Sequence, residues 1–192
     1  KASATLDDLV TRFPGQSHYD EAQFRRGETF FSAKQYAEAE RAYAAVLAVG
    51  PQSEFNEQAL YKRGWSLFKL SRNEESSESF LKLLDRLLIA DGKLRPAADL
   101  TRPQHELADD AMRALSLMFS GSEGPKSLVA ALEAHGAKSP YEAQLYSALG
   151  DLYIEKERYQ DAAEAYRAFS RRQPMSTDAP LLLNKAADAY GK

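Results

Sequence analysis

The sequence predicts an all-α fold, an α-solenoid of about ten helices arranged in antiparallel pairs. Two segments, 19–51 and 141–174, carry small, aromatic and proline residues at the same spacing, and weaker copies of the pattern occupy most of the remaining chain. Each copy is long enough for two short helices and a turn. Because one helix pair can bury its apolar face only against neighbouring pairs, the repetition predicts a stack of pairs without sheets.

The two strong copies align on Gly27 and Gly150. Counted from each glycine, an aromatic residue follows at position three and another at nine, an alanine at twelve, a tyrosine at sixteen and a proline at twenty-four. These residues are Phe30, Tyr36, Ala39, Tyr43 and Pro51 in the first copy, and Tyr153, Tyr159, Ala162, Tyr166 and Pro174 in the second. Six matched positions at one spacing indicate a true repeat.

Each shared position has a physical reason. The glycine lets the two helices of a pair approach where a side chain would clash, and the alanine does the same from the second helix. The aromatic residues fill the space between helices and between neighbouring pairs. The proline ends the second helix and fixes the turn into the next pair.

A further copy lies at 57–84, with Gly64, Leu67 and Phe80 at the matching positions. Ser76 replaces the alanine, and Asn73 replaces the aromatic residue of the turn, so we expect a less tightly locked turn there. The pattern resembles the tetratricopeptide repeat family, whose period is about 34 residues. The spacing here is 37 residues (64 − 27), and the extra length in 52–57 is similar to the longer turns of bacterial envelope members.

The remaining copies are incomplete. Segment 107–136 is degenerate, with Ser116 and Phe119 at the small and aromatic positions. Residues near both ends match half pairs: Ala2, Leu6, Leu9 and Pro14 a second helix, and Leu183, Ala187 and Tyr190 a first helix. We divide the single array into half repeat 1–16, full repeats 17–53 and 54–90, degenerate repeat 105–138, full repeat 139–175 and half repeat 176–192. Cut pairs predict self-association through exposed apolar helix faces.

One segment, 90–106, is irregular. Such a length is unusual inside a compact domain, but a solenoid tolerates insertions between repeats because each repeat contacts only its neighbours. Pro96 and Pro103 argue against a continuous helix through the segment. We therefore expect an irregular insertion there.

Composition narrows the possible partners. The net charge of −3 gives no basic excess for nucleic acid. The sequence has no apolar run of membrane-spanning length and no cysteine, which excludes disulfides, thiolate nucleophiles and cysteine-ligated zinc. The first residue is Lys1, so we expect the chain to be a piece of a longer protein whose targeting segment is absent.

The sequence shows no arrangement of residues for catalysis. His18, His105 and His135 lack the helical spacing of metal ligands and are interpreted as surface or loop residues. The adjacent pairs Asp7–Asp8 and Asp109–Asp110 point in different directions on a helix and cannot share a proton. No phosphate-binding loop, nucleophile elbow or zinc-protease motif is present. We predict no enzyme activity, no metal and no cofactor.

The family resemblance implies a binding surface on the first helix of each pair, which lines the concave groove of tetratricopeptide arrays. Transferred to this sequence, the groove positions predict partner-binding residues Phe24, Glu28, Phe31, Tyr61, Trp65, Phe68, Arg113 and Asp151, with Leu117, Ser147 and Ile154 beside them. Aromatic residues anchor protein interfaces. The alternative is that the rings pack between helices, and that nearby Arg25, Arg26, Lys62 and Arg63 only cover apolar surface.

The same positions argue against one mode of binding. Family members that bind chaperones hold a C-terminal carboxylate with lysine and asparagine in the groove, whereas this chain has Phe24, Glu28, Tyr61 and Trp65 at the matching positions. The departure implies a hydrophobic peptide or a helix as the ligand.

Segments 106–120 and 139–169 are similar to the large periplasmic repeat proteins that accompany TonB–ExbB–ExbD energy-transduction systems. This resemblance implies a periplasmic scaffold. Outer-membrane assembly lipoproteins and the Tol-Pal-associated coordinator share the long-turn repeats and stay open as alternatives. An architectural spacer with an empty groove, or the non-catalytic domain of a larger envelope enzyme, would also fit the sequence.

Overall fold

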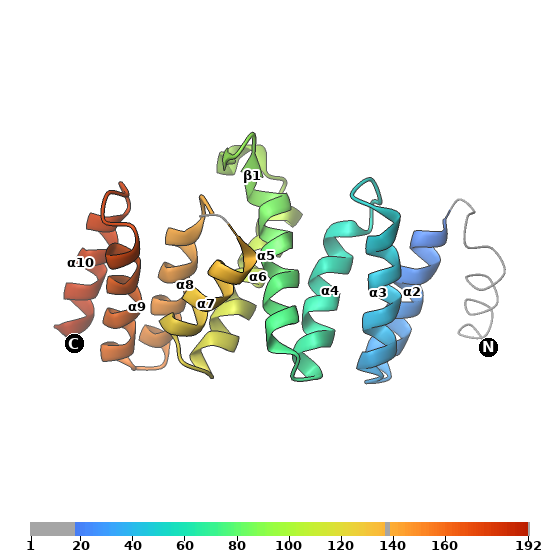
Figure 1. Cartoon of the computed structure of the whole chain (residues 1–192), viewed down its shortest axis with the longest axis horizontal. Coiled ribbons are helices and arrows are strands. Elements are labelled where there is room, and N and C mark those ends of the chain that lie inside the picture. Colours follow the sequence, from blue (N-terminus) through green and yellow to red (C-terminus); the bar gives the residue numbers. More distant parts are fainter. Residues whose placement is uncertain (1–17, 137–138, 192) are drawn as a thin grey trace. The chain divides into compact units, whose positions relative to one another are not determined.

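A computed structural model describes residues 18–136 and 139–191. The described residues form two compact units, which divide after Leu83. The first unit contains α2 (Tyr19–Ser32), α3 (Tyr36–Val49), α4 (Asn56–Lys69) and the larger part of α5 (Asn73–Leu88) (Figure 1). The helices alternate in direction as antiparallel neighbours. The described residues contain nine α-helices in all. The expected half repeat 1–16 lies outside the described residues.

The second unit begins within α5 and continues through a small hairpin into five helices. These elements are β1 (Ile89–Ala90), β2 (Lys93–Leu94), η1 (Ala97–Asp99), α6 (Arg102–Ser120), α7 (Pro125–His135), α8 (Glu142–Glu155), α9 (Tyr159–Arg172) and α10 (Ala179–Tyr190). Helices α8 and α9 form an antiparallel pair, and α10 packs against α9. The predicted all-α fold of antiparallel helix pairs is confirmed.

The glycine of each well-formed pair lies directly beneath a ring of the second helix. A Cβ atom added at Gly27 would be 2.5 Å from Tyr43 Cε1, one at Gly64 2.7 Å from Phe80 Cζ, and one at Gly150 2.2 Å from Tyr166 Cε1. Carbon atoms do not approach so closely without displacement. The glycines therefore form the sockets that receive these rings, as the repeat pattern predicts.

The other shared positions also occupy structural sites. Ala39 and Ala162 are fully buried, and the core around Ala39 includes Tyr43, Val46 and Ala59. Tyr36 and Tyr159 begin the second helices, and Tyr153 is buried. Pro51 and Pro174 follow the ends of α3 and α9 within two residues. Serine replaces alanine in the α4–α5 pair, where the buried Ser76 hydroxyl donates to the Gly64 carbonyl at 2.7 Å.

The turn inside each of these pairs has the same backbone structure. Lys34, Ser71 and Glu157 each have a positive φ, between 57° and 61°. In the α8–α9 turn, Glu157 N donates to Ile154 O and Arg158 N donates to Tyr153 O. This is the Schellman arrangement, which satisfies the last carbonyl groups of a helix and usually has glycine at the left-handed position. Each α2–α3, α4–α5 and α8–α9 turn is thus closed in the same way, although none has glycine there.

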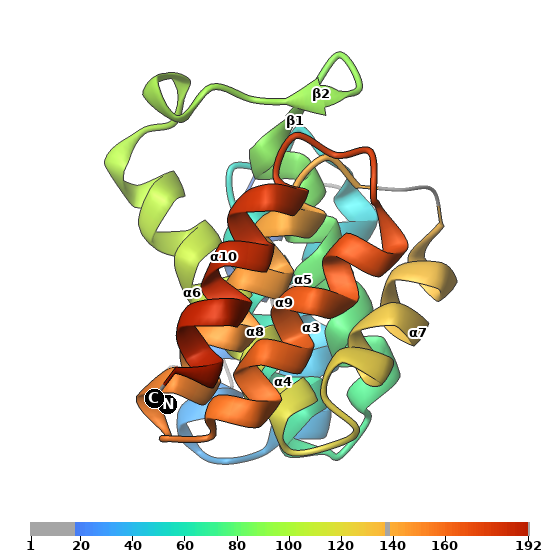
Figure 2. The same cartoon turned by 90° about the vertical axis from the view of Figure 1, so that its left-hand side faces the viewer.

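The insertion corrects one expectation, because it contains a sheet. Strands β1 and β2 pair antiparallel, with Ile89 opposite Leu94 and Ala90 opposite Lys93. Asp91 and Gly92 connect them with φ values of 52° and 72°, as a two-residue type I′ turn requires. The dipeptide Asp-Gly is the sequence signal for such a hairpin, and our sequence interpretation overlooked it. Figures 1 and 2 show the hairpin projecting beyond the helices of its unit.

Beyond the hairpin, Arg95 organises the chain before α6. Its guanidinium donates to the carbonyl of Asp99 at 2.8 Å, and its backbone N–H donates to Leu88 O at 2.7 Å. Helix α6 begins with a capping box between Thr101 and Gln104, and Pro103 lies in its first turn. Proline is tolerated there because backbone N–H groups of the first turn have no acceptor within the helix. The prolines therefore bound the helix, and none interrupts it.

The α6–α7 pair differs from the others. Helix α6 packs along α8, while α7 makes only a few contacts with α6 and equally few with α9. Figure 2 shows the two helices on opposite sides of the α8–α9 pair. Their connecting turn is fixed at Gly124, where a Cβ atom would lie 2.7 Å from the hydroxyl of Tyr153. The degenerate sequence of 107–136 thus corresponds to a splayed pair.

Candidate functional site

The first unit presents the predicted aromatic residues on its two first helices, α2 and α4. Phe24, Phe31, Tyr61, Trp65 and Phe68, which we call the α2–α4 aromatic face, are all partly exposed. Four of the five rings contact rings outside the face. Phe31 meets Tyr36 with ring centroids 5.4 Å apart, and Trp65 meets Phe80 at 5.8 Å. Phe24 stacks on Phe55 with ring centroids 5.2 Å apart, and Tyr61 meets the buried ring of Phe80 at 6.0 Å. The face is therefore both a packing surface and a solvent-accessible one.

The other contacts of this face involve Phe31, which lies near a lysine, and the adjacent rings of Trp65 and Phe68. Lys62 Nζ is 5.6 Å from the centroid of the Phe31 ring, in the geometry of a cation–π contact. Trp65 meets Phe68 edge to face, with centroids 5.7 Å apart. Edge-to-face contacts fix ring orientation while leaving part of each face accessible. The result is an ordered aromatic surface across α2 and α4.

Glu28, another predicted partner-binding residue, already has two intramolecular contacts. Its carboxylate accepts a hydrogen bond from Tyr43 at 2.6 Å and lies 3.1 Å from Lys62 Nζ. Burial of Tyr43, together with its bond to Glu28, raises the pKa of its hydroxyl well above the ordinary value. Tyr43 therefore stays a hydrogen-bond donor at any physiological pH, and Glu28 joins α2 to α3 and α4.

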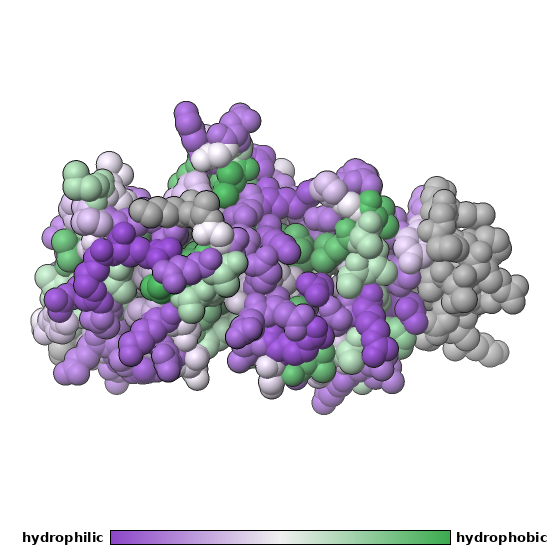
Figure 3. Space-filling model, viewed as in Figure 1, coloured by the Kyte–Doolittle hydropathy of each residue, from purple (hydrophilic) through white to green (hydrophobic). Residues whose placement is uncertain are grey.

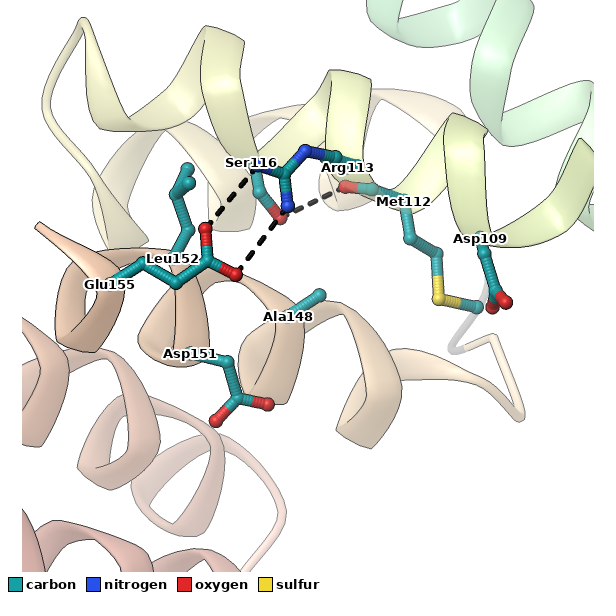
Figure 4. A pocket seen from close by; sticks show the side chains of 8 residues that line it. All are labelled: Asp109, Met112, Arg113, Ser116, Ala148, Asp151, Leu152 and Glu155. Atoms are coloured by element: carbon teal, nitrogen blue, oxygen red, sulfur yellow. Dashed lines mark hydrogen bonds and ion pairs between the residues drawn. The ribbon is translucent and has the colours of Figure 1, made fainter. Parts of the chain in front are cut away.

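The second unit brings Arg113 and Asp151, two of the predicted partner-binding residues, into one pocket. The pocket has a volume of about 180 Å³ and is lined by Asp109, Met112, Arg113, Ser116, Ala148, Asp151, Leu152 and Glu155, from α6 and α8 (Figure 4). Arg113 and Glu155 form an ion pair at 3.3 Å across it. Met112, Ala148 and Leu152 provide apolar surface. The pocket is a shallow slot with charged edges.

Asp151 is directed toward α9 and α10. Its carboxylate accepts a hydrogen bond from Tyr166 at 2.7 Å and lies 3.0 Å from Lys185 Nζ. Burial and the bond to Asp151 raise the pKa of Tyr166 well above the ordinary value. The Lys185 ammonium also donates to Ser147 Oγ at 2.8 Å. Asp151 therefore has a packing role in addition to lining the slot.

Sequence interpretation missed two features of the second unit. A wider groove of about 420 Å³ lies between α7 and α9, lined by Pro125, Lys126, Val129, Glu164, Ala168, Arg171 and Arg172. Its two arginines are paired, Arg171 with Glu164 and Arg172 with Glu133 and Glu142. The regular repeat does not predict this groove, because it arises where α7 departs from the usual pairing.

The second missed feature is a hydrogen-bonded cluster at Asp85. His135 Nε2 donates to Asp85 at 2.8 Å, and the Tyr141 hydroxyl donates to it at 2.5 Å. Burial raises the pKa of Asp85, but the hydrogen bonds from His135 and Tyr141 outweigh it and leave the pKa below the ordinary value. With a side chain only 9% exposed, His135 is not the surface residue that we expected.

The other two histidines fit their expected environment. His18 precedes α2 and is exposed, and His105 donates to the carbonyl of Ala97 beside the hairpin. Among residues 18–136 and 139–191, no three His, Asp or Glu side chains converge as metal ligands. No helix in the same residues is long and apolar enough to cross a membrane.

The surface outside these sites is mostly polar. On the side viewed in Figure 3, hydrophilic side chains predominate and the hydrophobic ones form small separate patches among the described residues. The large apolar residues with the greatest exposure are Met175, Leu181, Leu183 and Tyr190. Three of these four belong to α10.

Comparison with known families gives a clear assignment. The model of the tetratricopeptide repeat matches residues 1–54, 24–92, 126–177 and 147–190. These overlapping matches include the glycine–ring pairs of α2–α3, α4–α5 and α8–α9. They leave out residues 93–125, which contain β2 and all of α6. A search of curated proteins found no significant match. Repeats of this kind form scaffolds for protein–protein interaction, and the chain belongs to the tetratricopeptide repeat family.

Proposed function

We propose that this chain is a non-catalytic scaffold that binds a hydrophobic peptide or helix of a partner protein on the α2–α4 aromatic face. The observation that carries the proposal is the ordered, partly exposed set of rings on two neighbouring first helices. Clustered aromatic side chains provide large contact area with little loss of conformational entropy on binding. A partner with an apolar helix face would bury the exposed ring edges.

The charges around the face support an apolar ligand over a carboxylate ligand. Lys62, the cation nearest the rings, is paired with Glu28, and Arg63 is paired with Glu40 at 2.8 Å. A ligand carboxylate would have to displace these intramolecular anions, at a cost in desolvation. An apolar segment needs no such exchange. The α6–α8 slot, with Arg113 and Asp151, provides a second contact region in the other unit.

We further propose that the complex belongs to the bacterial cell envelope, in the periplasm, as part of a TonB-type energy-transduction system. The support is the resemblance of segments 106–120 and 139–169 to periplasmic repeat proteins of those systems. The alternatives are an architectural spacer, an accessory domain of a larger envelope enzyme, and a subunit of an outer-membrane assembly complex. The neighbouring genes and the sequence of the full-length protein would distinguish these settings.

Trp65 provides a direct test, because it is the chain's one tryptophan and lies on the proposed binding face. Proteins captured from an envelope extract on immobilised chain are identified and titrated into it, and tryptophan emission is followed. Binding at the face should shift the emission to shorter wavelength, since a partner excludes water from the indole ring. Replacing Phe31 and Phe68 with alanine should weaken binding at least about tenfold, as losses at interface anchors do.

The matched control replaces Tyr190, a half-exposed aromatic residue of the other unit, with alanine. It should leave binding and the emission shift unchanged. Circular dichroism of each variant verifies that the helices remain folded. If a partner binds without any change in tryptophan emission, and the Phe31/Phe68 variant binds it as tightly as the original chain, the α2–α4 aromatic face is not the binding site.

A further inference from the structure

A set of three contacts occurs twice in the chain at the same sequence spacing. Glu28 accepts a hydrogen bond from Tyr43, 15 residues later, and binds the ammonium of Lys62, 34 residues later. Asp151 accepts a hydrogen bond from Tyr166 and binds Lys185, again 15 and 34 residues later. In both sets the carboxylate directly follows the glycine of a helix pair. Two occurrences at one register, in different units, are not accidental surface pairs.

We infer that these residues form an interhelix clamp, in which one carboxylate fixes the second helix of its own pair and the first helix of the next. The carboxylate and the tyrosine lie on α2 and α3 in one case and on α8 and α9 in the other, while the lysine lies on α4 or α10. The clamp thus controls how firmly one repeat holds the next, which the glycine–ring socket within a pair does not determine.

The ammonium group of each clamp lysine contacts both a carboxylate and an aromatic ring. Lys62 Nζ lies 3.1 Å from Glu28 and over the ring of Phe31, while Lys185 Nζ lies 3.0 Å from both Asp151 oxygens and 5.5 Å from the centroid of the Tyr166 ring. A carboxylate that accepts a hydroxyl hydrogen bond is held in place before the ammonium binds. Because charge-assisted hydrogen bonds and cation–π contacts add to the ion pair, the lysine loses mobility.

Copies without the clamp have apolar residues at the same positions. In the α4–α5 pair, Trp65 replaces the acid and Phe80 replaces the tyrosine, and the two rings meet with centroids 5.8 Å apart. In the degenerate copy, Leu117 and Leu132 stand at these positions. Acid and hydroxyl therefore occur together or are both absent, which indicates that they act as one unit.

Helix α10 provides the clearest test, because it is joined to its neighbours by one clamp, a short apolar face and two hydrogen bonds from α9, Arg167 to Tyr190 and Ser170 to the Ala179 carbonyl. That face consists of the buried residues Ala179, Leu182, Ala186 and Ala189. Amide hydrogen exchange is measured by mass spectrometry on the whole chain and on Lys185→Met, which keeps the aliphatic stem but removes the charge. Exchange in α10 should accelerate several-fold, while exchange in α8 and α9 should change little.

Three further measurements identify the clamp as the cause. Lys185→Arg, which keeps the positive charge, should protect the amides of α10 as well as the original chain does. Asp151→Asn, which removes the negative charge and keeps the side-chain shape, should cause part of the acceleration seen in Lys185→Met. Raising the salt concentration to about 1 M should accelerate exchange in α10 of the original chain, but not in Lys185→Met, since salt screens partly exposed charges. Lys126→Met, which removes a lysine from α7 in the same unit, should leave α10 unchanged.

The inference is overturned if α10 keeps its protection in both Lys185→Met and Asp151→Asn. It is also overturned if Lys126→Met accelerates exchange in α10 as much as Lys185→Met does, because the effect would then come from the net charge of the protein and not from the clamp. Neither outcome depends on the proposed binding face, so the two proposals are tested separately.

Discussion

Single residues determine how closely the helices of a pair approach. Gly27, Gly64 and Gly150 are each covered by the ring sixteen residues later, so the smallest side chain and a large one form a matched socket and knob. Such a contact has no tolerance for added volume, because protein interiors are packed to crystal-like density. The glycine–ring match is therefore the residue-scale determinant of the fold.

Replacing Gly150 with alanine should destabilise the second unit by up to about 2 kcal/mol. The new methyl group would collide with Tyr166, and overpacking, which costs about 1–3 kcal/mol, exceeds the gain in helix propensity of about 1 kcal/mol. Urea denaturation followed by circular dichroism measures the change. Gly121→Ala is the matched control, because the nearest atom to a Cβ there is 3.6 Å away, and it should be neutral or slightly stabilising. Equal effects of the two substitutions would contradict the socket.

At the scale of elements, the regular pairs and the irregular ones are held by different means. The α2–α3, α4–α5 and α8–α9 pairs combine a glycine socket with a Schellman turn. Helix α7, which scarcely contacts α6, is instead fixed at its end by His135, whose ring donates to Asp85 on α5. Where the repeat degenerates, this polar contact therefore adds to the apolar burial of Leu128 and Leu132.

The Asp85 cluster should make the attachment of α7 dependent on pH. The folded-state pKa of Asp85 is below its ordinary value of 3.8, so its stabilising contribution is present above pH 3.8 and is lost as pH falls through the lower folded-state pKa. Asp85→Asn removes this contribution. The difference in urea midpoint between the original chain and this variant should be greatest near pH 7 and should shrink below about pH 3.8.

A different acidic residue provides the comparison for that experiment. Asp110→Asn changes an exposed carboxylate of α6 in the same unit and should leave the midpoint unchanged at both pH values. A difference between the original chain and Asp85→Asn that stays constant from pH 7 to pH 3 would show that the ionised carboxylate is not the cause.

At the scale of the whole molecule, the exposed residues of α10 predict self-association. Leu183 and Tyr190, which lie seven residues and so about two turns apart on one side of this helix, are 47% and 56% exposed. Exposed apolar side chains that lie together favour contact with another apolar surface. Sedimentation velocity should show association that increases with protein concentration. Leu183→Glu should shift the distribution toward monomer, because burying the new charge is unfavourable.

Met175, which is 95% exposed in the turn before α10, provides the control for this prediction. Met175→Glu adds the same charge away from the α10 face and should leave the association unchanged. A single monomeric species at all concentrations would contradict the prediction. Residues 1–17, where the sequence predicts another half repeat, lie outside the described residues.

Most of the fold follows from the sequence, because a repeated register leaves few alternatives. The spacing from glycine to tyrosine predicts the sockets at Gly27 and Gly150, and the proline positions predict the ends of α3 and α9. Arg113 and Asp151 line one slot in the structure, and their role in binding a partner stays a prediction. Whether the five aromatic residues bind a partner stays a prediction, since their partial exposure permits both packing and binding.

The sequence by itself determined the helix pairs, since glycine, alanine and aromatic residues at fixed spacing are local constraints on how two helices meet. Only the tertiary structure decided the contacts between residues far apart in the chain. It joined His135 to Asp85, separated α7 from α6, and gave Glu28 and Asp151 their lysines from the following pair. The physical reason is that a side chain's partner across two helices depends on helix orientation in space, which a spacing pattern within one pair does not contain.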